Sequence, residues 1–143
     1  MKISKSFRKS QIEVITAAVN NTRQVLPFPG LKGIRVRSTK KDSFQGWAEI
    51  PEKGKAIIFV NRELKKADLF TVVVHEMTHV SQYLRGDLES TDEGFIWRGK
   101  AYCYSDNYWE NIDYFKYRSL PWEAEAYSTG EVLTEMMWNN TGG

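Results

Sequence analysis

The segment from Leu69 to Arg85 constrains the fold most, because its apolar residues recur with the period of an α-helix. On a helical wheel, these side chains fall within one arc about 100° wide, which predicts the face that packs on a core. They are Leu69, Phe70, Val73, Met77, Val80 and Leu84. Asp68 is the predicted N-cap of this helix, and Gly86 is the predicted residue just after its end. The only two histidines, His75 and His79, lie one turn apart and almost opposite the arc.

The histidines form the sequence HEMTH, in which Glu76 follows the first of them. Two imidazoles at positions i and i+4 can each place a nitrogen about 2.0–2.1 Å from one Zn²⁺. Glu76 lies about 60° or more around the helix, so its carboxylate reaches a water on the metal instead of the metal itself. As a base, it can take the proton of that water during attack on a carbonyl and pass it to the leaving amine. The pattern predicts one zinc per chain and peptide hydrolysis; two solvated surface histidines are the alternative.

A catalytic zinc of this kind needs a third protein ligand. The chain has no third histidine, and Gln82 and Arg85 stand where the extended histidine motif requires Gly and His. The missing ligand should therefore be a carboxylate from another element, and the segment PWEAEAY offers Glu123 and Glu125. A helical wheel over residues 121–138 places the two glutamates on opposite flanks of an apolar arc and does not choose between them.

Small side chains on one flank favour Glu123. Gly130 and Thr134 continue the Glu123 flank, so this side of the helix could approach the histidine helix closely enough to share a metal. We expect Glu123 to bind zinc through a carboxylate oxygen, and Glu125 to be solvated or to support a ligand. Gln82 projects from the histidine side and could contact substrate or loop backbone, although a polar residue at a helix rim is ordinary.

HEMTHVSQY, followed some forty residues later by PWEAEAY, resembles the gluzincin branch of the zincin metallopeptidases. In particular it resembles small metallopeptidases encoded by bacteria and bacteriophages, and the resemblance covers about residues 56–138. In gluzincins the third ligand is a Glu of an E-x-x-A-type helix, which implies Glu123 here, three residues before Ala126. Tyr127 occupies the position where the family usually has Asp or Asn. Its hydroxyl could orient a ligand or donate to a developing oxyanion, and a packed aromatic ring is the alternative.

Three short runs have β character: residues 33–38 (GIRVRS), 45–50 (QGWAEI) and 55–60 (KAIIFV), the last two joined by the turn sequence PEKG. A helix is predicted from about Lys5 or Gln11 to Asn21, with Ser10 and Glu13 as a capping box. Residues 87–120 are expected to be loop-rich, with a hairpin around Gly99, and Pro121 should start a last helix reaching about Asn139.

These elements predict an α+β chain forming one domain over residues 1–143. The fold expected is minimal and zincin-like: a small, mostly antiparallel sheet packed with the HExxH helix and a C-terminal ligand helix. The resemblance also implies that an exposed sheet edge binds an extended peptide by strand addition, and QGWAEI is the candidate edge.

Composition limits the remaining possibilities. Cys103 is the only cysteine, which excludes an internal disulfide and fits a reducing compartment. No apolar stretch approaches the length of a membrane span. We therefore expect a cytoplasmic protein without a membrane partner. Residues 1–66 carry a net charge of +10 and residues 67–143 one of −8. The basic half could hold a nucleic acid or an acidic partner, but it contains no nucleic-acid motif, and complementarity between the halves explains the pattern equally well.

The function predicted is zinc-dependent peptide hydrolysis, with narrow specificity for a peptide or protein that the sequence does not identify. One alternative is a catalytically inactive zincin-fold module that keeps zinc and binds other proteins. Another is association with DNA through the basic N-terminal half. Glu76 favours an enzyme, because a purely structural site needs only the ligands. The oligomeric state does not follow from the sequence.

Overall fold

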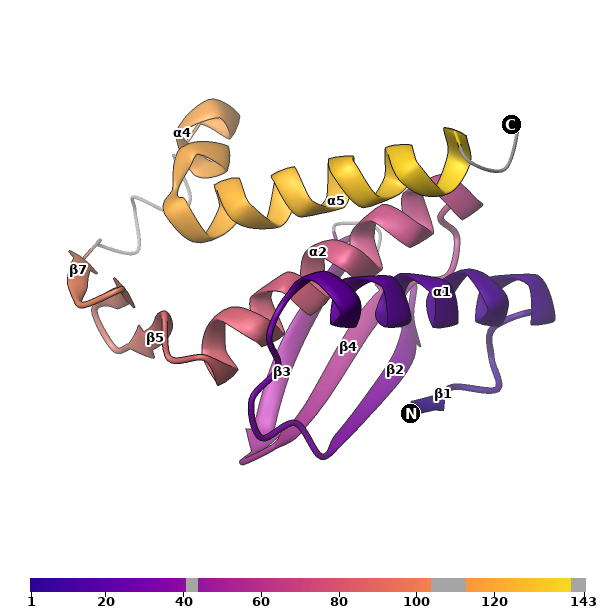
Figure 1. Cartoon of the computed structure of the whole chain (residues 1–143), viewed down its shortest axis with the longest axis horizontal. Coiled ribbons are helices and arrows are strands. Elements are labelled where there is room, and N and C mark those ends of the chain that lie inside the picture. Colours follow the sequence, from indigo (N-terminus) through magenta and orange to yellow (C-terminus); the bar gives the residue numbers. More distant parts are fainter. Residues whose placement is uncertain (41–43, 104–112, 140–143) are drawn as a thin grey trace.

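The computed structural model describes residues 1–40, 44–103 and 113–139 (Figure 1). Within these residues the fold is mixed α+β, as predicted, and consists of two small sheets and four helices. The helices are α1 (Lys9–Val25), α2 (Lys66–Leu84), α4 (Tyr114–Ser119) and α5 (Pro121–Asn139). Helices α1 and α2 lie on one face of the larger sheet, and α5 packs along α2 on the side away from that sheet (Figure 1).

The larger sheet has the strand order β1 (Lys2–Ile3), β2 (Gly33–Thr39), β4 (Lys55–Asn61) and β3 (Gly46–Glu52). Pairs β1–β2 and β2–β4 are parallel, whereas β3 and β4 form the predicted antiparallel hairpin, which turns at Gly54 with φ +82°. The three predicted runs are thus confirmed as strands, and QGWAEI contributes the edge strand β3. The two-residue strand β1 was not predicted.

A second sheet contains β5 (Leu88–Thr91), β6 (Gly94–Trp97) and β7 (Lys100–Cys103) in that order. Strands β6 and β7 form the predicted hairpin around Gly99. Strand β5 and helix α4 lie in the stretch expected to be loop-rich. Over both sheets, three of the five strand pairings among the described residues are antiparallel, in line with the predicted sheet type.

The main core lies between the larger sheet and the helices. Alternate residues of β2 and β4 point toward the helices and are buried, as expected for strands with one covered face. They are Ile34, Val36, Ala56, Ile58 and Val60. The predicted core arc of α2 is confirmed, since all its members except the half-buried Leu84 are completely buried. His75 and His79 consequently point away from the sheet, toward α5.

The helix ends differ in part from the expectation. Helix α2 has Lys65 as its N-cap, so Asp68 lies in the first turn, where its charge still stabilises the helix N-terminus. Helix α1 is capped by Gln11, whose Oε1 accepts from the backbone nitrogen of Arg8 at 2.8 Å, and not by the predicted Ser10–Glu13 pair. Gly86 follows α2 with φ +79°, as predicted. No helix in the described ranges is long and apolar enough to cross a membrane.

Candidate metal centre

Close packing of α2 against α5 brings the candidate ligands together. A Cβ atom on Gly130 would lie 3.3 Å from Thr71 Cγ2, so the helices are close enough here that a larger residue would be crowded. One turn further along α5, the hydroxyl oxygens of Thr134 and Thr71 are 2.7 Å apart. This is the flank of α5 on which Glu123 lies. The contact therefore places Glu123 over the histidine side of α2.

His75, His79 and Glu123 form one group, which we call the metal cluster. Glu123 Oε1 lies 3.0 Å from His75 Nε2 and 3.2 Å from His79 Nε2. One potential ligand atom from each of the three residues lies within 4.8 Å of the others. Donors that share a tetrahedral zinc at about 2.0–2.1 Å are about 3.3–3.5 Å apart, so the two imidazole–carboxylate separations are close to those of a zinc site. The residue types and these two separations suit a divalent metal ion, and zinc takes such ligands.

Gln82 sets the orientation of the His79 ring. Its side chain is completely buried, and its amide nitrogen donates to the carbonyl oxygen of Trp122 at 2.8 Å and to Glu125 Oε1 at 2.9 Å. The amide oxygen therefore faces His79, 2.8 Å from Nδ1. Because that oxygen can only accept, Nδ1 carries the hydrogen. In a neutral ring the lone pair is then on Nε2, the atom turned toward Glu123 and the one a metal needs.

Without a metal, the same contacts require an extra proton, because His79 Nε2 must then donate to Glu123. Burial alone lowers the pKa of His79, but its contacts, Glu123 first, outweigh burial and raise the pKa to about 9. Burial alone raises the pKa of Glu123, whereas hydrogen bonds and charge from the two histidines lower it to about 2. The metal-free cluster is an imidazolium held by a carboxylate. A divalent cation would replace that proton and keep the same ligand atoms.

Glu76 lies beside the metal cluster without belonging to it. Its side chain is largely buried, and it lines the two clefts that open on the histidines. Among the described residues the carboxylate makes no hydrogen bond, and no fully buried side-chain polar atom lacks one, so its oxygens face the clefts. Burial is the largest influence on Glu76 and raises its pKa, against the opposing charges of the histidines. A carboxylate in this position can act as a base.

Tyr117 is a part of the site that the sequence reasoning missed. Its hydroxyl, on α4, donates to Glu123 Oε2 at 2.9 Å, so both oxygens of that carboxylate are engaged. Burial, followed by the charge of Glu123, raises the pKa of Tyr117. The residue precedes Glu123 by six positions in a stretch without clear periodicity, which left no signal by which to select it.

Tyr127 packs against the metal cluster through its ring and makes no hydrogen bond to Glu123 among the described contacts. Its ring lies edge-on to His75, with 4.6 Å between ring centroids, and it lines the same cleft as Glu76. Burial is the largest of the influences that raise the pKa of Tyr127 to about 12, so its hydroxyl is protonated at neutral pH. The residue thus has a donor at the cleft and a packed ring, which leaves its predicted catalytic role a prediction.

Glu125 belongs to a different group, which we call the arginine cluster: Arg85, Asp87 and Glu125. Arg85 pairs with Glu125 Oε1 at 2.5 Å and with Asp87 Oδ2 at 2.8 Å. Gln82 connects this cluster to His79. Glu125 therefore supports the site through Gln82 and is not one of the three side chains grouped as candidate metal ligands.

Two clefts of about 430 and 300 Å³ open on the metal cluster, and both are bordered by β3. Gly46 lets this edge strand approach α2, because a Cβ atom there would lie 2.8 Å from Val72 Cγ1 and 3.6 Å from Glu76 Cγ. The edge strand and the candidate base are therefore neighbours. No family model, curated protein or solved structure matches this chain.

Proposed function

We propose that this protein is a zinc metallopeptidase that binds one Zn²⁺ through His75, His79 and Glu123. The observation that carries the proposal is the joining of these three donors from two helices, with Glu76 in the same cleft but outside the ligand set. When bound, zinc supplies a Lewis acid that activates water and polarises the scissile carbonyl. The resemblance of the two motifs to gluzincins supports the same function.

Glu76 would carry the proton in this reaction. Its oxygens face the cleft, and its raised pKa brings the carboxylate nearer to the pH at which it works. It would take a proton from the attacking water and give it to the leaving amine. Tyr127 remains protonated at neutral pH and could donate to the carbonyl oxygen as negative charge develops there.

The substrate would be an extended peptide or protein segment added along β3. An edge strand presents unpaired backbone groups that an extended chain can bond, and β3 borders both clefts beside Glu76. The two clefts beside the metal cluster would receive side chains of the peptide near the scissile bond. A single cysteine fits a reducing compartment, so we propose that the enzyme acts in the cytoplasm.

Glu76→Gln tests the proposal because it removes the base while leaving the ligands in place. The zinc-loaded protein should cleave members of a peptide library, stop when a chelator is added, and recover with zinc. Glu76→Gln should retain zinc, but its turnover should fall about 10²- to 10⁴-fold. Glu135→Gln, the same change at an exposed position of α5, should behave like the wild type.

Two results would reject this function. Turnover of Glu76→Gln within a few-fold of wild type would remove Glu76 from the mechanism. A zinc-loaded wild-type protein that cleaves no peptide in the library would instead indicate the inactive zinc-binding module.

A further inference from the structure

The larger sheet has one face that no element of the described chain covers. The helices lie against the other face (Figure 1). Parallel strands usually occur in sheets covered on both sides, and here β1, β2 and β4 are parallel. We call this uncovered side the open face. Its residues alternate with the buried core residues of the same strands, so they project away from the metal cluster.

Cations occupy the β1–β2 side of the open face. Arg35 and Arg37 are exposed on β2, two residues apart, and Lys2 of β1 stands opposite Arg35 in the register. None of these three side chains has a carboxylate partner among the described residues. Lys55 of β4 lies nearby and has only the exposed ion pair with Glu52, 3.2 Å long. Such pairs contribute little, so the open face keeps a net positive charge.

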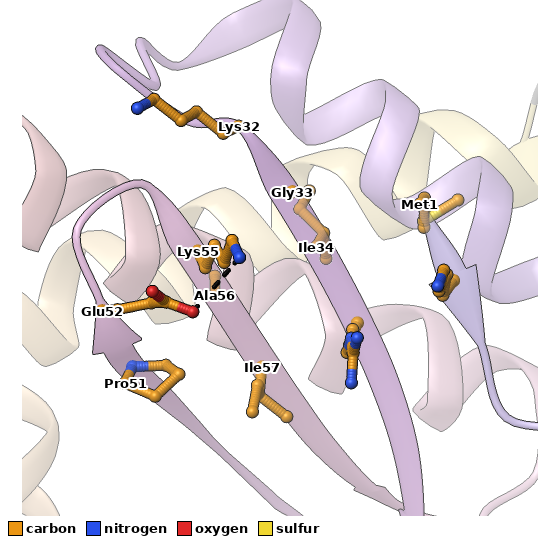
Figure 2. Close-up of a pocket in the computed structure, with 11 residues that line it drawn as sticks. Met1, Lys32, Gly33, Ile34, Pro51, Glu52, Lys55, Ala56 and Ile57 are labelled. Carbon is orange, nitrogen blue, oxygen red and sulfur yellow. Dashed lines mark ion pairs between the residues drawn. The ribbon is translucent and has the colours of Figure 1, made fainter.

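The open face is hollowed between these cations. A concavity of about 410 Å³ is bordered by Lys32 and Lys55 and has Ile57 in its lining, and Figure 2 shows these side chains around it. A second concavity, of about 420 Å³, continues along β1 and β2 between Lys2 and Arg37. Arg35 lines both. The two concavities therefore form one cationic track across the strands.

Aromatic rings lie at the other end of the cross-strand row that contains Arg37. The row of Lys2 and Arg35 ends instead at Glu49, whose carboxylate accepts from Trp47 Nε1 at 3.2 Å. Arg37 is paired with Phe59, and Phe59 is paired with Trp47 on β3. The Trp47 and Phe59 rings are stacked, with centroids 4.5 Å apart and planes 14° apart. A planar aromatic surface beside a row of cations is the combination that proteins use to bind single-stranded nucleic acids, whose bases stack while their phosphates meet lysine and arginine.

We propose that the open face binds single-stranded nucleic acid, with phosphates along Lys2, Arg35 and Arg37 and bases against Phe59 and Trp47. The carboxylates of an acidic peptide would pair with the cations but cannot stack on the aromatic rings, whereas nucleic-acid bases can. The aromatic pair therefore favours a nucleic acid. Part of the positive charge of the basic N-terminal half would then serve as the phosphate-binding surface on the open face. Because the open face is on the side of the sheet away from the metal cluster, binding is independent of zinc.

Fluorescence anisotropy with a labelled oligo(dT) 20-mer and the full chain tests this proposal. Wild-type affinity should fall with salt with a log–log slope of about −2, as expected for roughly three phosphate contacts to a single strand. Arg35→Glu/Arg37→Glu should weaken binding at least about tenfold, and Arg35→Ala/Arg37→Ala should reduce the slope by about 1.4. Phe59→Leu should weaken binding about fivefold or more while leaving the slope unchanged.

Lys65→Glu/Lys66→Glu is the matched control, with the same change in net charge at exposed positions outside the open face. Both glutamates lie at the N-terminal end of α2, where a negative charge is favourable, and affinity should stay within about threefold of wild type. Circular dichroism would verify that each variant is folded, and chelated protein should bind as well as zinc-loaded protein.

Three outcomes would overturn the proposal. Equal losses in the two charge-reversal variants would mean that only bulk charge matters. Equally tight binding of poly-glutamate, abolished by the arginine substitutions, would identify the open face as a site for acidic polypeptides. Dissociation of a homodimer by Arg35→Glu/Arg37→Glu would show that a second copy of the chain occupies the face.

Discussion

Two polar clusters connect α2 to α5, and each contains one of the glutamates of the PWEAEAY segment. In the metal cluster, Glu123 meets the imidazole nitrogens of His75 and His79. In the arginine cluster, Glu125 meets the guanidinium of Arg85. The two glutamates are two residues apart on one helix, so the same residue type serves both clusters with different partners.

The difference lies in whether the cation can be replaced. A guanidinium keeps its protons at any pH a protein survives, so Arg85 is a permanent positive charge beside Glu125. An imidazole can give up a proton and expose a lone pair to a metal. Of the two clusters, only the metal cluster could therefore exchange a proton for a metal ion, whereas the arginine cluster connects α2, α5 and Asp87. Gln82 links the two clusters. Its amide nitrogen donates to Glu125 of the arginine cluster, and its amide oxygen is thereby held against Nδ1 of His79 in the metal cluster.

The largest expected effect is on zinc affinity, which a substitution in the metal cluster should lower far more than one in the arginine cluster. His79→Ala should lower zinc affinity by well over about 100-fold, because it removes a ligand and not only a supporting bond. Arg85→Met should leave zinc affinity within a few-fold but reduce the free energy of unfolding by roughly 1–3 kcal/mol, because it removes the guanidinium that Glu125 and Asp87 share. Among the described residues, Glu125 then keeps only its bond from Gln82, and Asp87 keeps only its pair with Arg98. Competition with a zinc-sensitive dye and denaturant unfolding measure the two quantities. Zinc loss in Arg85→Met equal to that in His79→Ala would erase the distinction.

A smaller effect is expected at the residue that joins the clusters. Gln82→Met removes the acceptor that fixes the hydrogen on His79 Nδ1, so zinc affinity should fall about 10- to 100-fold while stoichiometry stays at one. Arg85→Met is the control, because it disturbs the arginine cluster and keeps Gln82. Unchanged affinity in Gln82→Met would show that the His79 ring is held by packing alone.

The smallest effect concerns the metal-free protein and pH. The pKa of His79 rises from 6.5 to about 9 on folding, so its stabilisation is complete below pH 6.5 and is lost as pH rises through about 9. The pKa of Glu123 falls from 4.5 to about 2, so its stabilisation is present above pH 4.5 and is lost as pH falls through about 2. Chelated protein should be less stable at pH 9 than at pH 6.5, and Glu123→Gln should weaken this decline. Equal stability at the two pH values would contradict the pairing.

Local patterns predicted much of this fold. The period of residues 69–85 identified α2 and its buried side, and the turn sequence PEKG identified the β3–β4 hairpin. Strand β1 was not predicted, because two residues are too few to show a periodic pattern and form a strand only by pairing with β2. The parallel pairing of β2 and β4 was not predicted either, because the alternation of buried and exposed residues in a strand is the same whichever way its neighbour runs.

In the candidate site, too, the sequence predicted the residues whose spacing lies within one segment and missed those that depend on packing between segments. HEMTH indicated two ligands and a base because their spacing lies within one helix, and the small flank of Gly130 and Thr134 indicated Glu123. Tyr117 and the burial of Gln82 depend on how α4 and α5 pack on α2. No periodicity within a single segment reports such contacts. The open face also required the register of β2, β4 and β3 to bring Arg37 into one row with the aromatic pair.

Zinc stoichiometry in paired glutamate variants tests the central claim most directly. Wild type, Glu123→Ala and Glu125→Ala would be purified with zinc, dialysed against a weak chelator and analysed by mass spectrometry for metal per chain. We predict near one zinc in wild type and Glu125→Ala, and a small fraction of one in Glu123→Ala. Full zinc in Glu123→Ala together with loss in Glu125→Ala would contradict the assignment of the third ligand to the metal cluster.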